Sequence, residues 1–175
     1  MAHLRGRAGV GAGVVAVVLL LVSWLATPPA SASTPWGACG LGTDEDKLVT
    51  QYAVNAHTNV YLRCSGPRWD PNPTSGYRHI LAKHRGDFER LAFGTYQNWR
   101  DIADLAMEAM ARDPDVAIPV RGAKACYSRV IFVRNLRTNQ VVGQRIVKMI
   151  VVIATNNIVT AYPASRQCEV GDETD

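Results

Sequence analysis

The sequence has little of what would place it in a familiar class of protein. Only 19% of its 175 residues are charged and 7% are aromatic, and it has four cysteines. This composition excludes a disordered acidic protein, a collagen and a coiled coil. Only one long apolar run is present, which excludes a polytopic membrane protein. The length fits a single domain.

Several catalytic signatures are also missing. The chain has no GxSxG, HExxH, Walker or GxGxxG motif, and no two cysteines form a CxxC pair. Its acidic residues do not cluster as a divalent-metal site would require. We therefore expect a protein with no metal and no cofactor.

The apolar run lies at the N-terminus and has the layout of a secretory signal peptide. Arg5 and Arg7 precede the uncharged stretch 10–26, and the small residues Ala30-Ser31-Ala32 follow it. The alternative is an uncleaved membrane anchor, for which the run is slightly short. We expect cleavage after Ala32 and a secreted monomer with no stable membrane association.

The rest of the chain divides into three regions after a leader at 1–32. The sequence predicts an N-terminal arm at 33–75 with one helix and a Pro-rich loop, a core at 76–168 of helices and antiparallel sheet, and an acidic tail at 169–175. Four cysteines in an exported protein indicate two disulfides. Three pairings are possible. We favour Cys39–Cys64 and Cys126–Cys168, which would pin the arm and the tail.

Apolar spacing predicts helices in the first half of the chain. We expect helices over 47–56, over 77–85 with Gly86 supplying a left-handed end, and from an Asn98 cap to Pro114. A short strand is expected at 60–62 and a loop at 66–76.

The second half is rich in Val and Ile and predicts strands at 127–134, 141–154 and 158–162. Turn-like segments at 138–140 and 155–157 separate them, and short connections imply antiparallel neighbours. Helices followed by strands predict an α+β fold, with N-terminal helices packed on a C-terminal meander of three to four strands.

Charge is concentrated in the middle of the chain. The segment from Lys47 to Cys168 holds 17 basic and 8 acidic residues. This excess of positive charge indicates a polyanionic partner, namely nucleic acid, anionic lipid or a cell-wall polymer. The alternative is that the charge serves only solubility.

Two histidines in the predicted helix over 77–85 are candidates for proton transfer. His84 lies at its expected C-terminal end, where the helix dipole favours the imidazolium. His79 is five residues away, about 140° around an α-helix, so the two should not share a face. We rank His84 first and His79 second; the alternative is a pair of surface or core histidines.

The last strand offers hydroxyl groups, and the surrounding segments offer cations. Thr160 and Tyr162 alternate with Val159 and Ala161, so they should point to one face and could bond a phosphate. Alternatively, they are only good strand formers. The planar guanidinium of arginine can donate two hydrogen bonds to the oxygens of one phosphate. The candidate cations are Lys83, Arg85, Arg90, Lys124, Arg129 and Arg145.

With His, Arg, Thr and Tyr available, the chemistry that fits is metal-free cleavage of a phosphodiester. A histidine would take the proton of an RNA 2′-hydroxyl or protonate the leaving oxygen. The motif His79-Ile80-Leu81-Ala82-Lys83-His84, the long helix ending at Pro114 and the final Val159-Thr160-Ala161-Tyr162-Pro163 resemble the ribonuclease superfamily of barnase, EndoU, colicin-type tRNases and RelE, in its phage and polymorphic-toxin branches.

That resemblance covers roughly 76–163 and implies a small nuclease-like core with its site on the sheet face. His84 and His79 would match the family's site histidine, which comes from the helical part. Thr160 and Tyr162 would match its hydroxyl-bearing residues on the last strand. The family's basic residue has no clear counterpart, and Arg129 is our first choice among the cations. The chain departs from the toxin branches in its leader and its cysteines. A cognate inhibitor protein stays open as a second partner.

Three functions therefore compete. The first is a secreted, metal-independent endoribonuclease, a toxin-like hydrolase with RNA as its substrate. The second is a non-catalytic binding module for a polyanion or a protein. The third is a disulfide-stapled protease inhibitor, for which the Pro-rich loop over 65–75 is the candidate contact.

Overall fold

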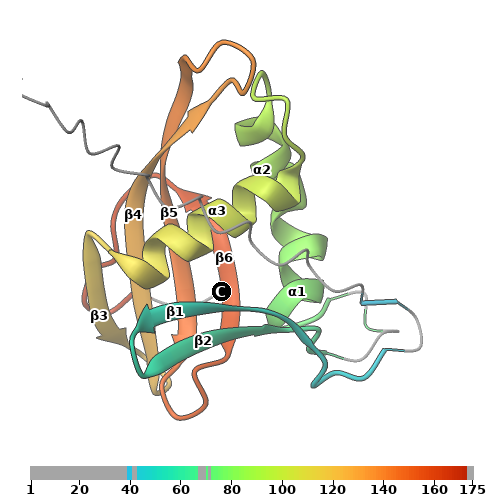
Figure 1. Cartoon of the computed structure of the whole chain (residues 1–175). Helices are drawn as coiled ribbons and strands as arrows, with labels where there is room; N and C mark the ends of the chain where they lie inside the picture. Colours follow the sequence, from blue (N-terminus) through green and yellow to red (C-terminus); the bar gives the residue numbers. More distant parts are fainter. Residues whose placement is uncertain (1–38, 41–42, 67–69, 71, 173–175) are drawn as a thin grey trace, which may run out of the picture. The chain divides into compact units, whose positions relative to one another are not determined.

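The first regular element is a β-hairpin, where the sequence predicts a helix. The computed structural model describes residues 39–40, 43–66, 70 and 72–172, and the expected leader at 1–32 lies outside them. Strand β1 spans Leu48–Asn55 and pairs antiparallel with β2, Thr58–Arg63 (Figure 1). The strand expected at 60–62 is confirmed as part of β2.

The helix prediction over 47–56 is wrong. A short run of apolar residues can fit both the 3.6-residue period of a helix and the two-residue period of a strand. Leu48 and Ala53, which helical spacing would bury, are exposed, whereas Tyr52 is buried. The β-branched residues of the segment favour a strand. The side chain of Asn55 accepts a hydrogen bond from the backbone N–H of His57 at 2.9 Å, which stabilises a turn at this point.

The helical part consists of four consecutive pieces. Helix α1 spans Gly76–His79, the π-helix η1 spans Ile80–His84 and α2 spans Arg85–Ala92. Helix α3 spans Trp99–Arg112 and begins with a complete capping box at Asn98, which confirms the expected cap. The end predicted at Gly86 is wrong, because the helix continues to Ala92; the left-handed glycine beyond it is Gly94, with φ +79°.

A four-stranded antiparallel meander forms the second half, in the order β3-β4-β5-β6. Its strands are β3 Val116–Val120, β4 Lys124–Arg134, β5 Val141–Val152 and β6 Ile158–Ala164. The last three match the predicted strands, and Asn139 and Asn156 adopt φ +56° in the turns, a conformation that Asn tolerates. Strand β3 was not predicted individually, since it is short and contains Pro119, which an edge strand accommodates.

The helices cover one face of this sheet, which confirms the α+β fold. Helix α3 lies against β4, β5, β6 and β1, while α1, η1 and α2 follow the edge strand β6 (Figure 1). Buried side chains of the hairpin, such as Tyr52 and Leu62, belong to the same core as Met107 of α3 and Met149 of β5. The arm and the core region are therefore packed around one hydrophobic interior. Residues 33–175 form a compact unit.

The other face of the sheet is covered by the C-terminal tail. Cys126 of β4 is bonded to Cys168, and together with Ile150 and Val159 they form a second apolar cluster. The nearly buried Lys148 donates a hydrogen bond to Asp172 at 2.6 Å. That bond is the main reason why the pKa of Asp172 falls to about 2.

Both predicted disulfides are confirmed, Cys39–Cys64 and Cys126–Cys168. Two disulfides are typical of an oxidising compartment such as the extracellular space. Among the residues that the structure describes, no helix is long and apolar enough to cross a membrane.

Candidate active site

A single π-helical turn brings the two candidate histidines together. An ordinary α-helix would separate His79 and His84 around its axis, which is what the sequence predicts. The turn at Ile80–His84 has i→i+5 geometry, and it aligns residues five apart. The two rings lie edge to face with their centroids 5.3 Å apart. The expectation that they would not share a face is therefore wrong.

His84 is oriented from two sides. Its Nδ1 lies 3.3 Å from Oδ2 of Asp87, one turn further along α2. Its ring stacks on the ring of Tyr162 from β6, with centroids 5.0 Å apart and planes 24° apart. Because a carboxylate only accepts hydrogen bonds, Nδ1 carries the proton and Nε2 keeps its lone pair. Arg90 donates to the other oxygen of Asp87.

Burial lowers the pKa of His84 below its usual value of 6.5. The hydrogen bond and charge of Asp87 oppose this shift, whereas the neighbouring His79 and Lys83 reinforce it. The helix dipole does not stabilise the imidazolium of His84 as expected, because the helix does not end there but continues to Ala92. The neutral imidazole is thus the dominant form near pH 7.

His79 lies behind His84 and is buried. Its Nδ1 is 2.7 Å from the carbonyl oxygen of Pro73, so Nδ1 donates and Nε2 is left as an acceptor. That Nε2 is buried and has no hydrogen-bond partner among the described residues. His79 is therefore not accessible to a substrate in solution, although its ring lies beside the ring of His84.

The hydroxyl groups predicted on the last strand occupy different environments. Tyr162 is partly exposed and contacts His84. Thr160 is fully buried, and its Oγ1 has no partner among the described residues. An irregularity in the pairing of β5 and β6 falls between Val151 and Ile150. It places Val159 in the tail-side cluster and Ala161 in the helix-side core, so the expectation that these two share a face is wrong.

Three of the candidate cations belong to the helical segment that carries the histidines. Lys83 donates to the side chain of Asn72 at 2.8 Å, and Arg85 pairs with Glu89 at 2.6 Å. Arg90 pairs with Asp87. Lys83 and Arg85 are the sequence neighbours of His84, and Arg90 reaches it through Asp87, which both Arg90 and His84 contact.

The other three cations are not part of this cluster. Arg129 pairs in the sheet with Val147, and Tyr162 pairs with Lys148, so Arg129 and Tyr162 point to opposite faces. Arg129 instead bonds Asp113 at 2.7 Å, at the end of α3.

Lys124 and Arg145 lie at opposite ends of the β4–β5 ladder. Arg145 pairs with Ile131, seven residues along β4 from Lys124. That separation corresponds to about 23 Å of strand. No single phosphate could contact both side chains.

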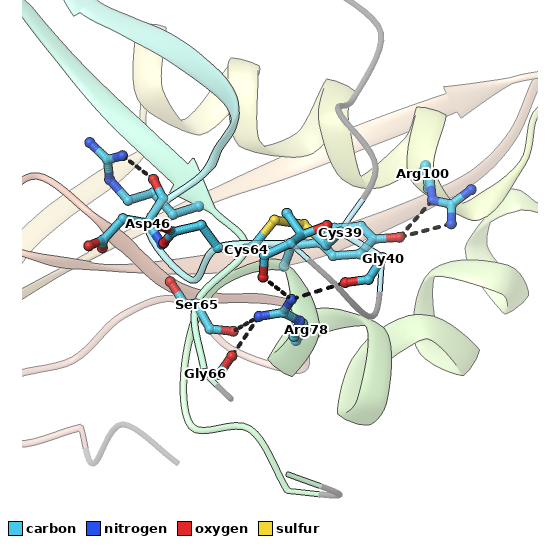
Figure 2. Close-up of a disulfide and its surroundings, with 12 residues drawn as sticks. Cys39, Gly40, Asp46, Cys64, Ser65, Gly66, Arg78 and Arg100 are labelled. Atoms are coloured by element: carbon cyan, nitrogen blue, oxygen red, sulfur yellow. Dashed lines mark hydrogen bonds between the residues drawn. A yellow bond between two sulfur atoms is a disulfide. The ribbon is translucent and has the colours of Figure 1, made fainter. Parts of the chain in front are cut away.

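The helix that carries the histidines is fixed at its beginning. Arg78 is buried, and its guanidinium donates to the carbonyl oxygens of Gly66 at 2.6 Å and Thr43 at 3.0 Å, with longer contacts to Ser65 and Gly40. Figure 2 shows this clamp beside the Cys39–Cys64 disulfide. Arg78 directly precedes His79, so its hydrogen bonds hold the N-terminal arm against the start of the helix that carries the histidines.

Gly76 allows the chain to enter this helix. It has φ +70°, and a Cβ on it would lie 2.6 Å from the backbone oxygen of Arg63. Any larger residue would both strain the backbone and displace β2 from the helix. A shallow hollow of about 560 Å³, lined by Gly86, Glu89, Arg90 and Phe93, continues the surface along α2.

Sequence reasoning missed Asp87 and Arg78. Asp87 lies three residues after His84, a spacing at which helix side chains meet, so that pattern could have indicated it. Arg78 gave no such signal, because its partners are backbone carbonyls brought near by the disulfide.

Comparison of the chain with protein-family models, with characterised proteins and with solved structures gave no match. Within the described ranges, no three His, Cys, Asp or Glu side chains gather as a metal site. The argument for function therefore rests on the His79–His84–Asp87–Tyr162 cluster.

Proposed function

We propose that the protein is a secreted, metal-independent endoribonuclease in which His84 transfers the proton. The observation that supports this proposal is the geometry of His84. Its Nδ1 proton is directed to Asp87, its ring is held against Tyr162, and its pKa is lowered. A neutral imidazole with one fixed nitrogen leaves the other free to act as a base.

The proposed reaction is an internal transfer of the phosphodiester. Nε2 of His84 takes the proton of a ribose 2′-hydroxyl, and the 2′ oxygen attacks the adjacent phosphorus. The bond to the 5′ oxygen breaks, and that oxygen takes a proton from water. The products are a 2′,3′-cyclic phosphate and a free 5′-hydroxyl.

Neighbouring groups would stabilise the charge that develops on the phosphate. The phenol of Tyr162 lies on the face of His84 and is partly exposed, so it is placed to donate to a phosphate oxygen. Lys83, Arg85 and Arg90 supply positive charge on the same helix. Asp87 and His79 act as positioning residues, since neither needs to touch the RNA.

The test is cleavage of total RNA and tRNA in EDTA by residues 33–175 with both disulfides oxidised. We expect His84→Ala to reduce the rate about 100-fold or more, which is the usual contribution of a general base. His57→Ala is the matched control, because His57 is an exposed histidine in the β1–β2 turn. Circular dichroism of all three proteins checks that they are folded.

Cleavage by the wild type and by His57→Ala, but not by His84→Ala, would support the proposal. No cleavage by folded wild-type protein, or equal rates for all three, would refute it. Appearance of a 2′,3′-cyclic phosphate end distinguishes this reaction from metal-dependent hydrolysis.

A binding module is the second candidate, and the burial of Thr160 favours it. A phosphate site built from a strand hydroxyl needs that hydroxyl at the surface, and Thr160 has none of its surface exposed. Such a module would hold RNA with the same affinity after His84→Ala. The protease-inhibitor alternative has less support, because an inhibitory loop must be exposed, and Pro73 of the Pro-rich loop is buried with its carbonyl oxygen against His79.

A further inference from the structure

Two loops far apart in the sequence form one protruding end of the molecule. The segment 93–98 follows α2, and the segment 134–142 contains the β4–β5 hairpin; we call them together the tip. The backbone N–H of Leu136 donates to Thr95 at 3.1 Å, and the side chain of Asn135 donates to Gly94 at 2.9 Å. The two loops lie side by side at the top of Figure 1.

The tip exposes an unusual amount of apolar surface. Exposure reaches 87% for Phe93, 64% for Leu136 and 61% for Tyr96, and it is 47% for Val141 and 45% for Val142. Scattered apolar side chains on a surface need no explanation, but several of them on two loops that are hydrogen-bonded to each other indicate an interaction site.

Positive charge accompanies this apolar surface, and the two loops themselves contain no acidic residue, although Asp101 of α3 accepts a hydrogen bond from Asn98 and Glu89 of α2 lines a hollow with Phe93. Within the two loops, the charged residues are Arg134 and Arg137. The guanidinium of Arg137 lies 4.0 Å from the ring centroid of Tyr96, and Arg134 donates to the carbonyl of Asn139. A surface of this kind is complementary to a partner that is anionic and has an apolar interior.

We propose that the tip binds reversibly to the surface of a membrane rich in anionic lipid. Arginines at the headgroup level attract the negative surface. Phe93, Leu136 and Val142 enter the boundary between headgroups and acyl chains, as the apolar residues of peripheral proteins do. Reversible binding of this kind is compatible with the expectation of no stable membrane association, and it takes up the anionic lipid that the basic charge balance indicates as one possible partner.

Other occupants fit the tip less well. A second copy of the chain would place the same arginines against each other. A nucleic acid would use the arginines and stack on rings, but it gives Leu136, Val141 and Val142 nothing to contact. Aliphatic side chains combined with cations favour a lipid surface over RNA.

The experiment is sedimentation of residues 33–175 with lipid vesicles. All described contacts of the core and both disulfides lie within this unit, and omitting 1–32 removes the apolar leader from the measurement. Vesicles of phosphatidylcholine with one part in three phosphatidylglycerol are compared with pure phosphatidylcholine. We expect about tenfold or greater preference for the anionic vesicles, and its loss at high salt.

Two variants and their controls locate the contact. The tip variant Phe93→Ser/Leu136→Ser/Val142→Ser should weaken vesicle binding about tenfold or more. The control variant Leu48→Ser/Ile153→Ser/Val170→Ser removes three exposed apolar side chains elsewhere and should bind as the wild type does. Arg134→Gln/Arg137→Gln should abolish the preference for anionic lipid, whereas Arg112→Gln/Arg166→Gln, in which both arginines have carboxylate partners, should keep it.

Absence of binding to anionic vesicles by the wild type would overturn the proposal, and so would equal losses in the tip variant and its control. If the tip variant kept vesicle binding but lost affinity for RNA, the tip would be a nucleic-acid surface instead. Because vesicle binding is measured without RNA, its result is independent of whether His84 cleaves RNA.

Discussion

The histidine cluster lies on the helical run 76–92 and the tip begins directly after it, and the two regions hold their cations differently. At the cluster, Arg85 and Arg90 have carboxylate partners, and Lys83 bonds an amide oxygen. At the tip, the arginines lie among residues that include no acid. A cation that already has a carboxylate orients its neighbours, whereas one without an acidic neighbour is available to an anion from outside. Two basic surfaces of one protein can therefore have different roles, one in orienting neighbouring side chains and the other in binding an external anion.

The two regions also differ in how they are supported. The beginning of the helix is held by a disulfide, by the buried Arg78 and by a glycine that no other residue can replace without strain. The tip is held by two hydrogen bonds between loops. Substitutions should therefore affect stability strongly at the histidine end and weakly at the tip, while the tip responds through binding.

The largest effect is expected from Cys39→Ser/Cys64→Ser. Loss of a cross-link with a sequence separation of 25 should lower the free energy of unfolding by about 3.5 kcal/mol, which urea denaturation would measure. Hydrogen exchange should accelerate in α1 and η1 but not in the loops of the tip. Equal acceleration in both regions would show that the disulfide does not support the histidine end in particular.

The next effect compares two left-handed glycines, one from each region. Gly76→Ala adds a Cβ that meets backbone at 2.6 Å, whereas a Cβ on Gly94 has nothing within 4 Å. Both substitutions strain the backbone by about 1–2 kcal/mol, and only Gly76→Ala adds a steric clash. We expect it to destabilise the protein by clearly more than Gly94→Ala does; equal unfolding midpoints in urea would contradict this.

A smaller effect concerns the titration of His84. Its pKa is lowered from 6.5 by burial and supported by Asp87, so Asp87→Asn should lower it further. Since the folded state resists protonation of His84 and the unfolded state does not, stability should fall as pH drops below 6.5, and level off below the folded pKa. NMR titration of the His84 ring checks the direction, with the exposed His57 as internal reference. A pKa that rises in Asp87→Asn would refute the assigned contact.

The smallest effect on stability is expected for Phe93→Ser at the tip. Its side chain is almost fully exposed, so the free energy of unfolding should change by less than about 0.5 kcal/mol. Vesicle affinity should nevertheless fall. A large loss of stability would mean that Phe93 is part of the core, and the comparison of the two regions would then fail.

Much of the fold could be predicted from local patterns. Helix α3 follows its Asn98 cap, the meander follows its Val- and Ile-rich runs with Asn in the turns, and both disulfides were expected. Each of these depends on neighbours in the sequence. Strand β1 was missed because eight residues with apolar side chains at mixed spacing fit a helix as well as a strand, and its pairing with β2 decided between them.

The candidate site was predicted only in part. His84 and Tyr162 lie together, as expected of residues in one site. The predicted angle between His79 and His84 around the helix axis was wrong, because the spacing of residues in the sequence does not reveal a π-helical turn. The separation of Arg129, Lys124 and Arg145 depends on strand register, which single residues do not reveal. Burial of Thr160 depends on packing that only the folded sheet provides.

The disulfide between Cys126 and Cys168 has a consequence for when the protein can mature. Without that bond, the tail is held to the sheet mainly by polar contacts, and the apolar side chains of Ile150 and Val159 are open to water. In a reducing cytoplasm the newly made chain would therefore present a bare sheet face, which is a typical target of chaperones. We expect the tail to close over it only in an oxidising compartment, where the disulfide can form.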